Sequence, residues 1–172
     1  MAEHIGISEV NLLHIYGVAK KCYQIAKEEG FDESFCRKMY MIGWCYNVGS
    51  EFTEVKEKQS NISAEMFRNL VNMSIILFGE MPDAMQKSYN AIHSAYNAIR
   101  QHGKYMDNMT DEWRILSIAD MLIDNKGAEV EVTTRLDELK KIYGEYSDQY
   151  LTACNICFKL GLTADNLVSL TT

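Results

Sequence analysis

Asp120 is the side chain of this sequence whose surroundings most strongly indicate chemistry. It lies in the apolar segment 116–121, which has the spacing of a helix. A carboxylate that is removed from water needs a hydrogen-bond donor, an opposite charge or a metal ion beside it. His14 and His102 also lie on predicted helices, where a single His is more often a hydrogen-bonded or solvent-facing residue than a ligand. We therefore expect Asp120 to mark a buried polar site.

Cys154 and Cys157 form a CxxC pair, which is the second arrangement of reactive residue types. A thioredoxin-type CxxC follows a strand, whereas this pair lies inside a helical pattern. A structural zinc site needs a second Cys or His pair, and the other three cysteines are scattered singly. Because residues i and i+3 share one face of a helix, we predict that both thiols pack, reduced, into the core.

Amphipathic helices must position these side chains. The pattern predicts one all-α domain of about six to seven helices over residues 1–172, with no internal repeat. The expected N-caps are Ser8, Asp32, Asn61 or Ser63, Thr110, Thr133 or Thr134, and Ser147, with Pro82 in the first turn of a further helix. The polar composition of residues 50–60 predicts a solvated loop, and residues 128–132 are predicted to form an extended linker.

Composition excludes several classes of function. The net charge of −7 and the isoelectric point near 5.1 argue against nonspecific binding to nucleic-acid polymers or anionic membranes. No apolar run approaches the ~20 residues that a membrane-spanning helix needs, and the acidic N-terminus is unlike a signal peptide. An odd number of cysteines fits a reducing compartment. We therefore expect a soluble cytoplasmic protein.

Four short segments share an order and spacing with a known family. They are residues 13–19, 45–49, 98–103 and 116–121, and Arg135 and Leu136 follow at a matching place. Over residues 8–145 the chain resembles HD-domain metal-dependent phosphohydrolases, which are helical proteins named for an adjacent His-Asp pair. In this sequence Tyr46-Asn47 stands where that pair belongs. A further family His, expected near residues 59–61, is also missing.

The resemblance implies a set of site residues. It makes His14, Asn47 and Asp120 the candidate metal ligands, and Tyr46, Arg100 and His102 further residues of the pocket. A phenol with a pKa near 10 is a poor ligand for a hard divalent ion, and Asn47 lacks the charge of Asp. Tight binding of metal is therefore not expected, although weakly held Mg²⁺ or Mn²⁺ fits a site that phosphate oxygens complete.

The surroundings of Asp120 allow two interpretations. One is metal ligation, and the other, slightly favoured, is a hydrogen bond from Asn47, Tyr46 or His14 without a metal. The cations expected nearest to the site are Arg100, Lys104 and Arg135, although surface positions in water are the commoner place for such residues.

Three functions follow as hypotheses. The favoured one is a degenerate, catalytically impaired HD-type protein whose pocket binds a nucleotide or another phosphorylated small molecule, or acts as a regulatory module. The second is a divergent phosphohydrolase that uses weakly bound Mg²⁺ or Mn²⁺. The third is a structural or interaction protein with a collapsed site. A homodimer is compatible with each of them.

Overall fold

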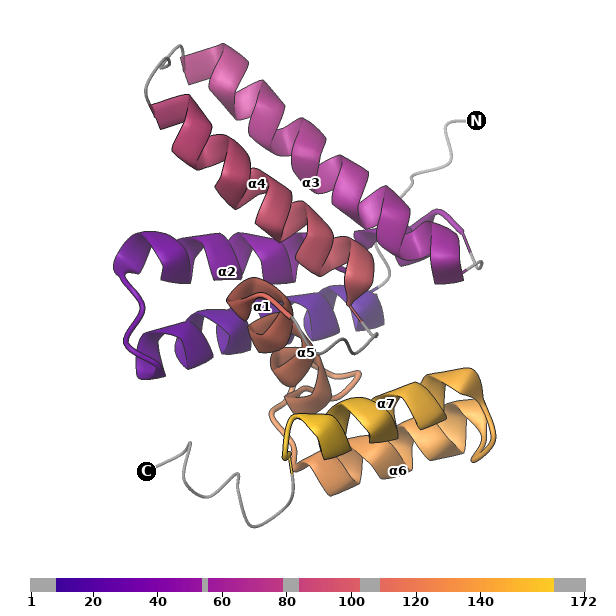
Figure 1. Ribbon diagram of the computed structural model, residues 1–172. Helices are drawn as coiled ribbons and strands as arrows, with labels where there is room; N and C mark the ends of the chain where they lie inside the picture. The colour runs from indigo at the N-terminus through magenta and orange to yellow at the C-terminus, as the bar shows by residue number, and fades with distance from the viewer. Residues whose placement is uncertain (1–8, 54–55, 79–83, 103–108, 163–172) are drawn as a thin grey trace.

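Helices form almost all of the regular structure in the computed structural model, which describes residues 9–53, 56–78, 84–102 and 109–162 (Figure 1). The elements are α1 (Glu9–Glu28), α2 (Glu33–Cys45), the 3-10 helix η1 (Val48–Glu51), α3 (Lys56–Phe78), α4 (Ala84–Gln101), α5 (Asp111–Leu122), α6 (Val132–Tyr143) and α7 (Asp148–Lys159). Within the described ranges, the one strand-like pairing is an isolated antiparallel bridge between Ile123 and Glu129. The predicted all-α class is confirmed.

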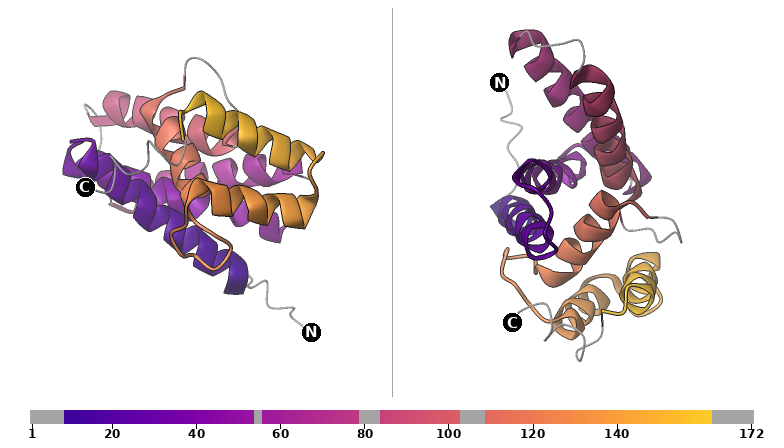
Figure 2. Two further views of the ribbon diagram at one scale, coloured as in Figure 1. Left: turned by 90° about the horizontal axis from the view of Figure 1, so that it is seen from below. Right: turned by 60° about the vertical axis from the view of Figure 1, so that its left-hand side comes forward.

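The helices form three antiparallel hairpins around α5 (Figures 1 and 2). The α1–α2 hairpin is the closest pair: a Cβ atom built on Gly43 would lie 2.5 Å from Cα of Ala19, so only a glycine lets the two backbones approach this far. The α3–α4 hairpin lies beside α2, and the α6–α7 hairpin packs at the end of α5. Helix α5 contacts both α1 and α4, which brings residues about a hundred positions apart in the sequence together.

The core fills the space between α1, α2, α4 and α5. Fully buried side chains come from each of these helices, among them Ile15, Cys22, Met39, Ile42, Ile99, Ile115 and Leu116. Burial of such aliphatic side chains supplies the main favourable term in folding, about 1.5–3 kcal/mol for each large one. The same packing fixes the relative positions of α1, α2 and α5, from which the candidate site is built.

Three of the predicted helix caps are confirmed. The side chains of Asp32, Thr110 and Ser147 accept hydrogen bonds from the backbone N–H three residues later. The cap predicted at Thr133 or Thr134 is wrong, because α6 begins at Val132 after Glu131, whose side chain makes no capping bond. The predicted loop 50–60 is shorter than expected, since η1 occupies its start and α3 already begins at Lys56. Ser8 and Pro82 lie outside the described residues.

The cysteines are free thiols, as predicted. Cys157 is buried and Cys154 is half-buried on the same helix, so the CxxC pair is packed only in part. Burial raises the pKa of the Cys157 thiol to about 12, which keeps it protonated and unreactive at neutral pH. None of the described helices has the length and apolarity that crossing a bilayer requires.

Candidate functional site

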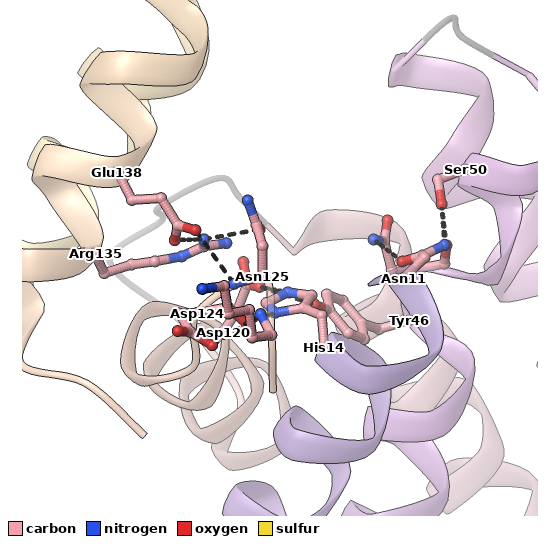
Figure 3. A network of polar contacts seen from close by, with 11 residues as sticks. Asn11, His14, Tyr46, Ser50, Asp120, Asp124, Asn125, Arg135 and Glu138 are labelled. Carbon is pink, nitrogen blue, oxygen red and sulfur yellow. Dashed lines mark hydrogen bonds and ion pairs between the residues drawn. The ribbon is translucent and has the colours of Figure 1, made fainter. Parts of the chain in front are cut away.

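The candidate site lies where α1, the end of α2 and α5 meet (Figure 3). It contains His14 from α1, Tyr46 directly after α2, and Asp120 from α5. We call these three residues the triad. Tyr46 is 2% exposed and His14 is 6% exposed, while the Asp120 side chain is 28% exposed. The triad is therefore an internal polar cluster with one edge toward solvent.

The polar atoms of the triad converge on one another. The Tyr46 hydroxyl oxygen lies 2.6 Å from Nε2 of His14 and 2.9 Å from Oδ1 of Asp120. The remaining pair, His14 Nε2 and Asp120 Oδ1, is separated by 3.1 Å. Tyr46 and His14, two of the three partners considered for Asp120, thus lie within hydrogen-bond distance of it.

The protons of the triad can be assigned from the hydrogen-bond pattern, since each ring nitrogen of His14 donates or accepts according to its tautomer. His14 Nδ1 is 2.8 Å from the backbone oxygen of Asp124, and a carbonyl only accepts, so Nδ1 carries a proton. If Nε2 were unprotonated, its lone pair would face the charged Asp120 oxygen. With a proton on Nε2 the contacts are compatible: Nε2–H lies within reach of the Tyr46 oxygen and of Asp120 Oδ1, and the Tyr46 hydroxyl donates to Asp120 Oδ1. The geometry therefore fits an imidazolium and a carboxylate bridged by a neutral phenol.

The electrostatics of Asp120 and Tyr46 agree with this assignment. Burial by itself raises the pKa of Asp120, but the hydrogen bond from His14 and the positive charges of His14, Arg135 and His102 outweigh it and hold the pKa well below its usual range. Burial, and then the charge of Asp120 and its hydrogen bond, raise the pKa of Tyr46 well above its usual range. The carboxyl group is thus ionised and the phenol stays neutral.

Arg135 belongs to the surroundings of the site, which corrects the expectation of a solvated surface position. Its side chain is 7% exposed, pairs with Glu138, and donates from Nη1 to Oδ1 of Asn125 at 3.0 Å (Figure 3). Its Nε is buried and has no hydrogen-bond partner among the described residues. The sequence signals for this network were the i,i+3 spacing of Arg135 and Glu138 and the turn before α6, and neither predicts burial.

His102 also contacts the triad. Its ring packs edge-on against the Tyr46 ring, with 5.1 Å between the centroids, and its Nδ1 lies 2.5 Å from the backbone oxygen of Ile99. Arg100 points elsewhere: it is exposed, and its Nε donates to Asn61 on α3 at 3.1 Å. The prediction that Arg100 lines the pocket is therefore not supported by its contacts. Lys104 lies outside the described residues.

Asn47 contacts the start of α1 instead of the triad. Its Nδ2 donates to Oδ1 of Asn11 at 3.0 Å, and the Asn11 amide donates to Ser50 at 2.7 Å and to Glu51 at 2.6 Å (Figure 3). Asn11 was not predicted as a site residue from the sequence, although its position one turn before His14 on the same helix was a usable signal. This cluster holds η1 against α1, so Asn47 has a structural partner of its own.

Few of the described side chains are therefore placed to bind a metal ion. Among the described residues, no three or more His, Cys, Asp or Glu side chains come together in a way that could hold a metal ion. His14 and Asp120 are the two candidate ligands that meet, and the phenol of Tyr46 bonds to the atom that each would offer.

The ionised state of Asp120 makes a prediction about pH. A carboxyl group whose pKa is lowered by folding stabilises the protein above its unfolded value, about 3.9, and this contribution is lost as the pH falls toward the folded value. We expect the difference in unfolding free energy between the wild type and Asp120→Asn to be largest near pH 7 and to shrink below about pH 4. Urea unfolding at several pH values measures it. The matched control is Asp137→Asn, at an exposed position on α6, which should change the stability at pH 7 by no more than about 0.5 kcal/mol.

No family model, curated protein or solved structure matches the chain.

Proposed function

We propose that this chain is a helical protein of the HD type that does not carry out metal-dependent phosphohydrolysis and instead acts as a binding or regulatory module. The observation that carries the proposal is the position of the Tyr46 hydroxyl, within hydrogen-bond distance of both His14 Nε2 and Asp120 Oδ1. In the resemblance to HD-domain proteins, these two residues correspond to metal ligands, and Tyr46-Asn47 replaces the central pair.

The chemistry of the Tyr46 phenol supports this proposal. A metal ion bridging an imidazole and a carboxylate lies about 2.0–2.2 Å from each donor atom. In this protein the oxygen that bridges the same two atoms belongs to a side chain, and burial together with Asp120 keeps it neutral. The imidazolium proton on Nε2 removes the lone pair that a metal needs. A metal ion at these two residues would therefore have to displace the Nε2 proton of His14 and the phenol of Tyr46.

The proposed ligand is a phosphorylated small molecule or a nucleotide, the ligand class that the resemblance suggests. The Asp120 edge of the triad is the part open to solvent. Its carboxylate repels an anion, so the positive charges of Arg135 and His102 around it would have to outweigh that repulsion. Binding is expected without turnover, because on this proposal the site holds no metal ion to activate a water molecule.

A second candidate function rests on the low exposure of His14 and Tyr46. Two site residues that are 6% and 2% exposed fit a collapsed site in a protein whose role is structural or interactive. Ligand titration separates the two functions. A binding module is stabilised by inorganic phosphate or a nucleoside monophosphate by RT ln(1 + [L]/Kd) in a thermal unfolding assay, whereas a collapsed site shows no shift.

Restoring the replaced pair tests the proposal directly. We expect the purified wild type to hold no stoichiometric metal after exposure to Mn²⁺, and the double variant Tyr46→His with Asn47→Asp to gain it, because removal of the phenol frees the two donors. Mass spectrometry of the metal content provides the measurement. Tyr40→His, on the same helix but away from the triad, serves as the matched control.

Two outcomes would contradict the proposal. Near-stoichiometric metal in the wild type that disappears in Asp120→Ala would favour the divergent phosphohydrolase. A double variant that folds and still binds no Mn²⁺ would show that Tyr46-Asn47 does not correspond to the metal-binding pair.

A further inference from the structure

The outer side of the α1–α2 hairpin carries a cluster of aromatic and basic side chains. Tyr16 on α1 is 44% exposed, and its ring lies 5.8 Å from that of the half-buried Trp44 on α2. Tyr40 packs edge-on against Trp44 at 6.3 Å, and Nζ of Lys20 lies 5.4 Å from the centre of the Tyr16 ring. Together with the neighbouring Arg37 and Met41 on α2, these residues form what we call the aromatic face: Tyr16, Lys20, Arg37, Tyr40, Met41 and Trp44.

The aromatic face is not covered by another described helix. Helices α4 and α5 lie on one side of the α1–α2 hairpin, as the right-hand view of Figure 2 shows. The buried residues of the hairpin, such as Ile15 and Met39, face that side. Tyr16, Met41 and Arg37 are exposed on the other. Single exposed apolar side chains are ordinary, but here two exposed ones, Tyr16 and Met41, accompany the half-buried rings of Tyr40 and Trp44 on two adjacent helices.

The residue types are those that protein interfaces favour. Tyr, Trp, Met and Arg are enriched at such interfaces, and Tyr, Trp and Arg dominate their binding energy. The rings of Tyr16, Trp44 and Tyr40 support one another, so a partner would order few side chains on binding. The close contact between Ala19 and Gly43 holds the two helices, and hence the aromatic face, in one arrangement.

The charge of the aromatic face is opposite to that of the whole protein. The chain carries a net charge of −7, whereas this face presents Lys20 and Arg37, and Lys27 is exposed further along α1. The acidic residue of the region is Glu33, which pairs with Arg37 and accepts a hydrogen bond from Tyr23. A partner with negative charge beside its apolar anchors is therefore complementary to this face.

We propose that the aromatic face is the docking site for an acidic amphipathic helix of a partner protein. The seam between two antiparallel helices accepts apolar side chains spaced i, i+4 and i+7 on a third helix, with Tyr16, Trp44 and Met41 as the contacting residues. Glu or Asp side chains along the flanks of that helix would meet Lys20 and Arg37. The inference does not depend on the triad, because Tyr16 lies about 200° around α1 from His14.

Peptide binding tests the proposal on the full chain. The probe is a fluorescein-labelled amphipathic helical peptide of about 18 residues, five turns, with Leu and Phe at the i, i+4 and i+7 positions and Glu on both flanks. Fluorescence anisotropy should show binding that weakens with added salt. The exposed variant Tyr16→Ser with Met41→Ser should weaken it at least about tenfold. Charge reversal by Lys20→Glu with Arg37→Glu should weaken it and remove most of the salt dependence.

Matched variants elsewhere on the surface are the controls. Tyr146→Ser with Phe158→Ser removes two side chains that are 87% and 79% exposed, and Lys126→Glu with Lys141→Glu reverses two exposed charges. Both should bind the peptide as the wild type does, and circular dichroism checks that all variants fold. A peptide with Lys in place of Glu should bind much more weakly.

Several results would overturn the proposal. They are no binding of the acidic peptide, equal binding of the Lys peptide, or equal losses in the control variants. Self-association in sedimentation experiments that Tyr16→Ser with Met41→Ser abolishes would assign the face to a second copy of this chain. Binding to phosphatidylserine vesicles that the same variant abolishes, without binding of the acidic peptide, would assign it to a lipid surface.

Discussion

Replacing Asp120 by Ala is expected to lower the free energy of unfolding by about 3 kcal/mol. The substitution leaves the His14 imidazolium, at 6% exposure, without its counter-charge, and it leaves the Tyr46 hydroxyl without its acceptor. Removing one partner of a buried ion pair costs roughly 3–5 kcal/mol. The partial exposure of Asp120 places the effect near the lower end. Urea unfolding at neutral pH measures it.

A double-mutant cycle separates the triad from a general loss of packing. In the background of His14→Ala, the further change Asp120→Ala should cost at least about 1 kcal/mol less than it does alone, since the charge it would leave unpaired is already gone. Asp137→Ala on the exposed side of α6 should change the stability by no more than about 0.5 kcal/mol. Equal costs for Asp120→Ala and Asp137→Ala would contradict the assignment of the triad as an ion pair.

Replacing Gly127 by Ala is expected to lower the free energy of unfolding by about 3 kcal/mol through two separate effects. Gly127 has φ +78°, a left-handed conformation that costs an L-residue about 1–2 kcal/mol. The added Cβ would also lie 2.3 Å from the backbone oxygen of Leu13 on α1. Because that atom is main chain, α1 and the turn must separate, with a cost of about 1–3 kcal/mol.

Gly30→Ala is the matched control for this prediction. Gly30 has φ +83°, and no other atom lies within 4 Å of a Cβ built there, so only the backbone effect of about 1 kcal/mol applies. Thermal and urea unfolding of the two variants should differ by the cost of the contact with Leu13. The same turn carries the Asp124 oxygen that accepts from His14, so Gly127→Ala should also disturb the His14 ring signals in NMR spectra. Equal losses in both variants would show that the contact with α1 is not tight.

Local interactions explain what was predictable for the helices. A cap such as Asp32, Thr110 or Ser147 acts within three residues of the helix it starts, and apolar spacing reports which side of that helix is buried. The cap of α6 and the start of α3 were predicted wrongly because at both places the local signal is weak and tertiary packing overrides it.

For the candidate site, too, one part was predictable from the sequence and another was decided by the tertiary structure. The need of Asp120 for a partner was evident from the sequence by itself, because a carboxylate within an apolar helix stripe must be compensated. His14 and Tyr46 came among the candidates only through the resemblance to HD-domain proteins. Which partner each polar group takes was decided only by the tertiary structure. The crossing of α1, α2 and α5 places the Tyr46 hydroxyl between His14 and Asp120, turns Asn47 toward Asn11, and buries Arg135 against Glu138 and Asn125. These contacts join residues up to 106 positions apart, and spacing along a single helix carries no information about such distances.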